Sequence, residues 1–356
     1  MAGNGLVQPL FEGPVDIVGD VHGEIDALRA LLRHLGYDND GVHPEGRRLV
    51  FLGDLTDRGP NSPAVVRLVT RLLDEGLAQC ALGNHDLNLL MGKKKHGNAW
   101  FFGRREALDA SGRIVPQALA DDETRALTLR LFRRLPLVLE RDDLRVVHAC
   151  WHAPSVEQVR QAPETDIVEL FRRHEARLDQ ELERLSRGEV RVEELLAALG
   201  MSNDEATAFF VCAGTAAETL HDGLLDKIGR GLVHQNANPV KRLLSGPERR
   251  VAAPFWSAGK HRHEERVPWW DHYGDDAWCV FGHYSRVDLP GEERRPFDQA
   301  RPYAGLGNGR VVCVDYSVTR RWQERFTGGP YRTALAALRW PERWLYFDTG
   351  RPVPVI

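Results

Sequence analysis

The sequence predicts an α/β protein with a mostly parallel sheet, because short apolar runs alternate with segments of helical periodicity. Each of the first three apolar runs is followed by a polar loop that contains glycine. Strands are expected at residues 15–19, 49–52 and 77–82, and helices at residues 24–35 and 63–73. This order of strand, helix, strand, helix and strand is typical of a parallel sheet whose faces are covered by helices.

The two early helices show apolar residues at the spacing of one helix face. In the first helix these residues are Ile25, Leu28, Leu31, Leu32 and Leu35. In the second they are Val65, Val66, Leu68, Val69 and Leu72. Each helix is therefore expected to pack one apolar face against the sheet.

Later parts of the chain add further strands and a charged helical region. Residues 137–140 and 144–149 flank the polar triplet Arg141-Asp142-Asp143, which suits a hairpin turn. Other strands are expected at residues 278–281, 311–314 and 344–347. Residues 155–208 are rich in Glu, Arg and Leu, which predicts two or three amphipathic helices.

Composition indicates an ordinary globular protein. The chain has 356 residues, of which 42% are hydrophobic and 28% charged. Its 47 basic and 51 acidic residues give a net charge of −4, so no overall positive field attracts nucleic acid. Five widely spaced cysteines, most of them in apolar runs, predict reduced core thiols. Because neither a secretory signal nor an apolar run of about 18 residues is present, we expect a cytoplasmic protein without a membrane span.

Three polar motifs follow the first three predicted strands. They are Gly19-Asp20-Val21-His22-Gly23, Gly53-Asp54-Leu55-Thr56-Asp57-Arg58-Gly59 and Gly83-Asn84-His85-Asp86. In open α/β sheets ligands bind where parallel strands end, so the three motifs are expected to converge. Their carboxylate, amide and imidazole groups suit Mn²⁺, Fe or Zn²⁺, and a carboxylate of the middle motif can bridge two cations roughly 3.5–4 Å apart. Each motif alone could be a polar turn, but the three together predict a metal site.

These motifs resemble those of the calcineurin-like metallophosphoesterases, and within them the phosphoprotein phosphatase branch. That branch includes bacterial Ser/Thr-type phosphatases and symmetrical diadenosine tetraphosphatases. The resemblance is close over residues 15–90 and is limited to short matches beyond them. It implies a sandwich of two β-sheets flanked by helices, the four-layer fold of the family, in a single domain over residues 14–356. The helices of residues 155–210 would be an insertion, either a solvated helical face or a cap over the active site.

The resemblance also implies a set of metal ligands. They are Asp20, His22, Asp54, Asn84, His148 and His283, with Asp54 as the bridge between two divalent ions. Mn²⁺ is the expected metal, with Fe and Zn²⁺ as alternatives. The family usually has a glycine after the strand-end His148, and here Ala149 and Cys150 follow it. Either late histidine alone could be a core residue, but each directly follows an apolar strand, as the resemblance requires.

The catalytic roles implied by the resemblance fall on the second and third motifs. A hydroxide activated by the two metal ions would attack phosphorus, and His85 would protonate the leaving oxygen. Asp57 would orient His85, and Arg58 would bind phosphate oxygens. A surface ion pair for Asp57 and Arg58, or a structural role for His85, is the alternative.

The expected function is hydrolysis of phosphate monoesters, with a phosphoprotein, a small molecule or a nucleotide as the substrate. The alternative is a nucleotide-directed hydrolase of the diadenosine tetraphosphate type, because Asp86 rather than Glu follows His85. A non-catalytic binding relative is a third possibility. Arg242 and Arg262 are candidates for a second phosphate-binding arginine, although a basic surface loop packed down by tryptophans is the favoured explanation of this region.

Overall fold

The computed structural model describes residues 4–105, 116–190, 230–257, 260–287, 293, 301–327 and 329–356. The chain divides into two compact units. The first, called the sheet unit here, consists of Gly5–His148, Trp270–Val287 and Pro296–Ile356. The second, called the helical unit, consists of Met1–Asn4, Ala149–Trp269 and Asp288–Arg295. The predicted single domain over residues 14–356 stays a prediction.

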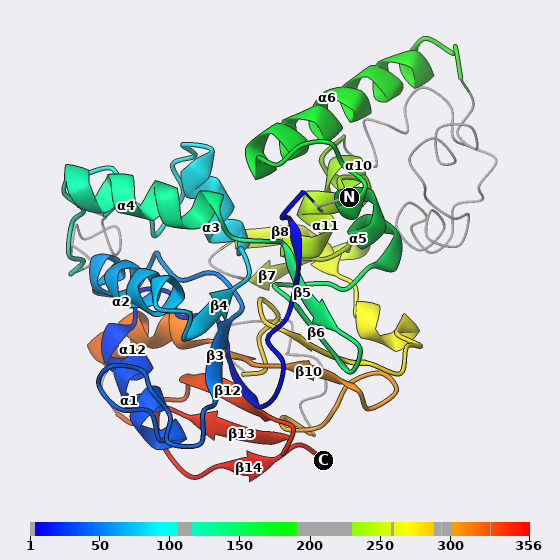
Figure 1. Ribbon diagram of the computed structural model, residues 1–356. Coiled ribbons are helices and arrows are strands. Elements are labelled where there is room, and N and C mark those ends of the chain that lie inside the picture. The colour runs from blue at the N-terminus through cyan, green and yellow to red at the C-terminus, as the bar shows by residue number, and fades with distance from the viewer. Residues whose placement is uncertain are drawn as a thin grey trace. The chain divides into compact units, whose positions relative to one another are not determined.

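Two sheets make up the sheet unit (Figure 1). The larger has the order β14-β13-β12-β2-β3-β4, and β11 pairs with β12. Its strands are β14 (Val353–Pro354), β13 (Trp344–Phe347), β12 (Ala334–Trp340), β2 (Val15–Val18), β3 (Arg48–Phe51), β4 (Ala78–Cys80) and β11 (Asp315–Tyr316). β2, β3 and β4 run parallel, as the alternating pattern predicts, whereas β12 joins β2 in antiparallel register.

The smaller sheet has the order β1-β5-β6-β9-β10. Its strands are β1 (Val7–Pro9), β5 (Val138–Arg141), β6 (Leu144–Val147), β9 (Trp278–Phe281) and β10 (Val311–Cys313). β5 and β6 form the predicted hairpin around Arg141-Asp142-Asp143. β6, β9 and β10 run parallel to one another, so residues that follow β6 and β9 lie at the same end of this sheet.

Helices flank the larger sheet. They are α1 (Ile25–Leu35), α2 (Ser62–Asp74), α3 (Asn84–Leu90), α4 (Asp122–Arg133) and α12 (Arg321–Thr327), with the short 3-10 helix η3 (Val318–Arg320) before α12. α1 packs on β12 and β13, and α2 packs on β4. The Asn61 side chain caps α2 by accepting a hydrogen bond from the Ala64 amide, and α1 ends at Gly36 with φ of 93°. The predicted two-sheet α/β fold with flanking helices is confirmed.

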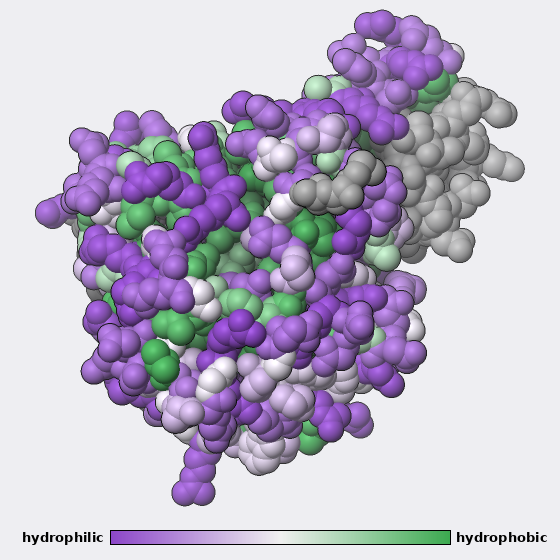
Figure 2. All heavy atoms as spheres, viewed as in Figure 1, coloured by the Kyte–Doolittle hydropathy of each residue, from purple (hydrophilic) through white to green (hydrophobic). Residues whose placement is uncertain are grey.

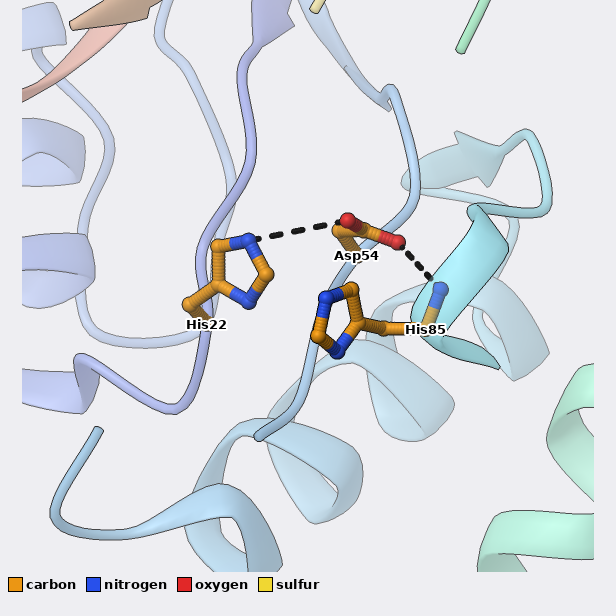
Figure 3. Close-up of side chains that lie close together, drawn as sticks. All are labelled: His22, Asp54 and His85. Atoms are coloured by element: carbon orange, nitrogen blue, oxygen red, sulfur yellow. Dashed lines mark hydrogen bonds and ion pairs between the residues drawn. The ribbon is translucent and has the colours of Figure 1, made fainter. Parts of the chain in front are cut away.

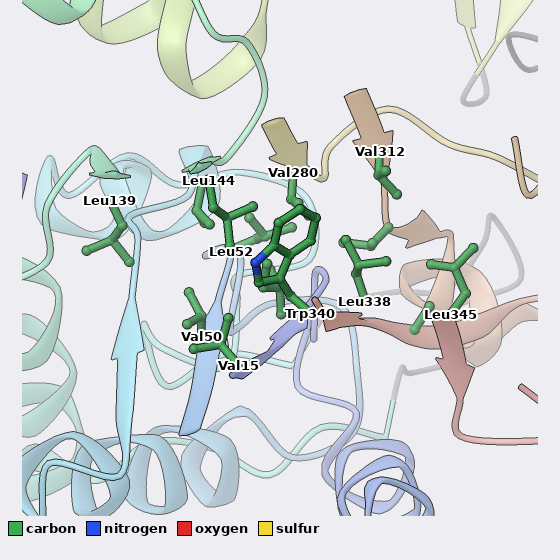
Figure 4. Close-up of a cluster of buried hydrophobic side chains, with 14 of the residues drawn as sticks. Val15, Val50, Leu52, Leu139, Leu144, Val280, Val312, Leu338, Trp340 and Leu345 are labelled. Carbon is green, nitrogen blue, oxygen red and sulfur yellow. The ribbon is translucent and has the colours of Figure 1, made fainter. Parts of the chain in front are cut away.

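The core of the sheet unit lies between the two sheets (Figure 4). The larger sheet, with the residues that follow its strands, contributes Val15, Val50, Leu52, Leu338, Trp340 and Leu345. The smaller sheet contributes Leu139, Leu144, Val280 and Val312. Because strand side chains alternate between faces, each sheet contributes one apolar face to this layer. The packing of the two sheets therefore determines which strand ends lie close together.

The helical unit contains α5 (Ala153–Arg160), α6 (Ile167–Ser186), α10 (Arg230–Ala237), α11 (Pro239–Ser245) and the antiparallel pair β7 (Glu248–Ser257) and β8 (Lys260–Arg266). The chain passes between the units within the 3-10 helix η2 (Trp269–His272). Glu175 of α6 binds Lys241 and Asn238 at 2.8 and 2.7 Å, which ties α6 to the start of α11. α6 and all but the first two residues of α5 fall within the predicted helical insertion, whose residues 191–210 lie outside the described residues.

Hydrophilic side chains cover most of the face shown in Figure 2, with apolar side chains in recesses between them. In the described part of the chain, none of the helices combines the length and the apolar character needed to cross a lipid bilayer. The described cysteines, Cys80, Cys150, Cys279 and Cys313, are buried and free of disulfides, and Cys212 lies outside the described residues. A cytoplasmic location stays a prediction.

Leu338 tests the apolar layer, because it is fully buried and pairs with Ile17 and Leu345 on the two neighbouring strands. We expect Leu338→Ala to lower the free energy of unfolding by about 2–5 kcal/mol, since the lost side chain leaves a cavity. Urea denaturation followed by tryptophan fluorescence measures the change. Arg29→Ala on the exposed face of α1 is the control and should change stability by less than about 0.5 kcal/mol. A loss for Leu338→Ala no larger than that of the control would contradict the described packing.

Candidate metal centre

The predicted motifs converge because neighbouring strands end in register. Val18 of β2 pairs with Phe51 of β3, and Phe51 pairs with Cys80 of β4, so the three motif loops leave the larger sheet at one edge. In the smaller sheet Val146 pairs with Val280, and His148 and His283 follow these two strands. All six predicted metal ligands thus belong to the sheet unit and lie beyond the carboxyl ends of parallel strands.

Asp54 is shared by two groups of metal-competent side chains. One group is His22, Asp54 and His85 (Figure 3), and the other is Asp54, His148 and His283. Within each group the ligand atoms lie within 4.8 Å of one another. The Nε2 atoms of His22 and His148 lie 3.6 and 3.5 Å from the same oxygen, Asp54 Oδ2. A carboxylate with imidazole groups on both sides has the arrangement needed to bridge two cations.

Asp20 and Asn84 lie next to these groups. Asp20 Oδ2 is 4.0 Å from His22 Nε2, and Asn84 Oδ1 is 3.1 Å from His148 Nε2. The structure therefore brings all six predicted ligands together. It also places His85, predicted as the general acid, among the metal-competent groups. The individual roles of these residues stay predictions.

Backbone carbonyl groups orient both imidazoles that face Asp54. His22 Nδ1 donates a hydrogen bond to the Thr56 carbonyl at 3.0 Å, and His148 Nδ1 donates to the Leu52 carbonyl at 2.8 Å. Because a carbonyl oxygen only accepts, each Nδ1 must carry a proton. The Nε2 atoms are then the positions that can bind a cation, and the carbonyl groups hold the two rings in that orientation.

The charges of the buried side chains also fit cations. Burial raises the pKa of Asp20 well above its usual range, and the nearby carboxylates of Asp315 and Asp54 raise it further. Burial opposes the charge on His148, but Asp54 and Asp20 outweigh this effect and raise its pKa to about 10. Three buried carboxylates repel one another, and positive charge among them lowers that repulsion. A bound cation would take the place of the His148 proton, so the donor set fits divalent metal ions.

Several of these residues have an uncommon backbone conformation. Among the described residues that are not glycine, positive φ occurs at His22, Asp54, Asp57, Arg58, His283, Ser317 and Arg343. Five of these seven are predicted site residues, with φ between 46° and 77°. This left-handed conformation costs energy and persists only where the surroundings enforce it. Gly282 has a different requirement, since a Cβ there would lie 2.1 Å from Asp20 Oδ1.

Asp86 joins the second and third motifs. Its carboxylate accepts hydrogen bonds from the amides of Asp54 at 2.9 Å, Gly83 at 3.0 Å and Leu55 at 3.3 Å. Burial, with a smaller effect of Asp54, raises the pKa of Asp86 to about 8. The sequence presents Asp86 only as a marker of the nucleotide-directed branch, but in the structure it links the loop that carries Asp54 to the start of α3.

The predicted acid and its partner are in direct contact. His85 Nδ1 donates to Asp57 Oδ2 at 2.7 Å, and the Asp57 side chain is fully buried. Half-buried Arg58 donates from Nη1 to the hydroxyl of Thr319 at 2.8 Å. Because this partner is a neutral hydroxyl that takes only one guanidinium nitrogen, the other nitrogens of the fork can bind phosphate oxygens.

The two candidates for a second phosphate-binding arginine belong to the helical unit. Arg242 on α11 is buried and donates from Nη1 to the Asn236 carbonyl at 3.4 Å. Arg262 on β8 donates from Nε to the Ser257 carbonyl at 3.4 Å. The predicted contact of either residue with phosphate stays a prediction.

Sequence reasoning missed three residues that support the site: Trp100, Asp315 and Thr319. Asp315 directly follows a predicted strand, which is the signal that identified the other carboxylates. Trp100 and Thr319 carry no such signal, because they contact Asp57 and Arg58 only through the fold.

Comparisons with known proteins agree with the motif resemblance. Residues 13–178 match the calcineurin-like phosphoesterase family. The asymmetrical bis(5'-nucleosyl)-tetraphosphatase PrpE of Halalkalibacterium halodurans is 38% identical over 145 residues, which cover 38% of this chain and 56% of that protein. PrpE of Bacillus subtilis is 35% identical over 142 residues, with 38% and 56% covered. The chain thus spans about half the length of the curated relatives it matches.

A solved chain provisionally described as a diadenosine tetraphosphatase is 19% identical, with a TM-score of 0.41 over 99% of this chain and 97% of that one. The predicted resemblance is confirmed by the match of residues 13–178 to the calcineurin-like phosphoesterase family.

The shared position of Asp54 can be tested by metal binding. We expect wild-type protein to retain two Mn²⁺ ions per chain, and Asp54→Asn to retain fewer, because the neutral amide cannot bridge two cations. Elemental analysis after gel filtration gives the stoichiometry. Asp26→Asn, which removes an exposed carboxylate of α1, is the matched control and should keep both ions. Two tightly bound ions in Asp54→Asn would refute the bridging role.

Proposed function

We propose that this protein is a metal-dependent hydrolase of phosphate esters with a preference for dinucleoside tetraphosphates. The observation that carries the hydrolase assignment is Asp54, whose carboxylate is common to both metal-competent groups. This proposal favours the nucleotide-directed alternative over the hydrolysis of phosphate monoesters that was first expected from the sequence. It is supported by the names of the curated relatives, which are tetraphosphatases.

The six clustered ligands would hold two divalent cations, with Mn²⁺ proposed, and these would lower the pKa of a shared water and offset phosphate charge. Asp57 accepts the Nδ1 proton of His85 and so fixes the orientation of its imidazole, and the proposed acid role requires a second proton on Nε2. This second proton would pass to the leaving oxygen. Arg58 has one guanidinium nitrogen on Thr319, and the rest of the fork can bind phosphate oxygens.

The surroundings of Arg58 favour a substrate with several phosphates. The Arg58 amide donates to the Gly97 carbonyl at 2.8 Å, which holds the segment of residues 93–97 against the arginine. Lys93, Lys94 and Lys95 in this segment are exposed. A monoester has one phosphate for Arg58, whereas a polyphosphate chain presents additional charges that this basic segment can attract.

A substrate panel tests the proposal. With Mn²⁺, we expect diadenosine tetraphosphate to be hydrolysed with a kcat/KM at least tenfold higher than p-nitrophenyl phosphate, a phosphothreonine peptide or a phosphate bis-ester. Phosphate release and nucleotide chromatography give the rates. Faster cleavage of the phosphopeptide would favour the phosphoprotein phosphatase alternative. Metal binding without hydrolysis of any compound would favour a binding role.

The proposed acid is tested by its dependence on the leaving group. We expect His85→Asn to lower kcat about 10²–10⁴-fold on an alkyl phosphate, whose alkoxide leaving group needs a proton. The loss should be smaller on diadenosine tetraphosphate, because a nucleotide phosphate is a better leaving group. Steady-state rates on both substrates, with the metal content of each protein, measure the effect. An equal loss on both substrates would instead indicate that His85 is a metal ligand.

A further inference from the structure

One short segment contacts both catalytic residues of the second motif. The Gly97 carbonyl accepts the Arg58 amide at 2.8 Å, and the indole Nε1 of Trp100 donates to Asp57 Oδ1 at 2.8 Å. Both motif residues have positive φ, 77° at Asp57 and 64° at Arg58. Gly97 packs so closely that a Cβ there would lie 2.5 Å from Arg58 Cγ. This segment therefore helps to enforce the uncommon conformation of its neighbours.

We propose that Trp100 is a positioning residue that acts on His85 through Asp57, an inference that rests on the proposed hydrolase function. The two oxygens of Asp57 have different partners. Oδ1 accepts from the indole of Trp100, and Oδ2 accepts from His85 Nδ1 at 2.7 Å. The indole N–H thus sets the rotation of the carboxylate, and the carboxylate in turn sets the plane of the imidazole.

Burial makes this contact strong. Trp100 and Asp57 are each fully buried, with a relative accessibility of 0%. In such surroundings water cannot replace a lost donor, and a hydrogen bond to a charged carboxylate is stronger than one between neutral groups. Without the indole N–H, Asp57 would keep His85 as a partner but lose the contact that holds its other oxygen.

The packing of Trp100 is separable from its hydrogen bond. The ring meets Phe101 edge-on, with centroids 5.6 Å apart. Trp100→Phe removes the N–H and keeps an aromatic ring in the core. Trp340→Phe is a matched control, because buried Trp340 also belongs to the sheet unit and donates its indole N–H to an aspartate, Asp143, at 3.2 Å. Asp143 is exposed and outside the predicted site, so this control reports the effect of removing an indole N–H elsewhere in the sheet unit.

The test compares kcat, KM and Mn²⁺ stoichiometry of Trp100→Phe and Trp340→Phe on an alkyl phosphate and on diadenosine tetraphosphate. We expect Trp100→Phe to lower kcat about 10–100-fold on the alkyl phosphate, with little change in KM or metal content, since losses of this size are usual for groups that orient a functional ligand. Trp340→Phe should keep the wild-type kcat. In the His85→Asn background, Trp100→Phe should cause no further loss, because the two residues act as one unit.

Three results would overturn the proposal: wild-type kcat in folded Trp100→Phe, an equal loss in the Trp340→Phe control, or full additivity with His85→Asn. If Trp100→Phe fails to fold, benzothienylalanine at position 100 replaces the N–H by sulfur and keeps the two-ring shape. The same loss of kcat is then expected, and full activity would overturn the proposal.

A measurement that needs no substrate separates this inference from the proposed function. In the wild-type protein the Nδ1 proton of His85, held by Asp57, should give a slowly exchanging NMR signal. Trp100→Phe should speed its exchange with water at least tenfold, and Trp340→Phe should not. Unchanged exchange would overturn the positioning role even if the protein hydrolysed none of the panel. Inactive wild-type protein with the expected exchange difference would refute only the proposed function.

Discussion

The structure of the site depends on the burial of several carboxylates in one place. Asp20, Asp54 and Asp315 are almost inaccessible to water, and each raises the energetic cost of charge on its neighbours. Such a cluster is tolerated only if positive groups or hydrogen-bond donors surround it. His22 and His148 face Asp54, and their rings are turned toward it by carbonyl groups of the backbone. The repulsion among these buried carboxylates destabilises the fold, and the same repulsion favours the binding of cations between them.

The loops meet this requirement at a cost in backbone conformation. His22, Asp54 and His283 each have a φ that residues with side chains rarely adopt. Asp86 offsets part of the cost, because its carboxylate accepts amides from both the loop of Asp54 and the turn at Gly83. Rigid loops of this kind hold ligand atoms at fixed separations, which is what selective binding of small ions requires.

Local patterns in the sequence predicted much of this arrangement. The apolar runs of β2 and β3 and the polar residues after them are adjacent in the chain, so both the strands and their motifs could be recognised. The position of β12 beside β2 could not be predicted from local sequence patterns, because that pairing joins residues about 320 positions apart. The contacts of Trp100 and Thr319 escaped prediction for the same reason. The left-handed φ of Asp54 is enforced by tertiary contacts, and its residue type gives little sign of it.

The six proposed ligands come from both sheets, since His148 and His283 follow strands of the smaller sheet and the other four follow strands of the larger one. Cations bound to these ligands would therefore link the two sheets and stabilise the apolar layer between them. Thermodynamic linkage makes this effect reciprocal. Metal binding would raise the melting temperature, and any change that destabilises the packing of the two sheets would lower the affinity for the ions. Substitutions of core valines and leucines far from the metal site would then raise the metal concentration needed to fill it.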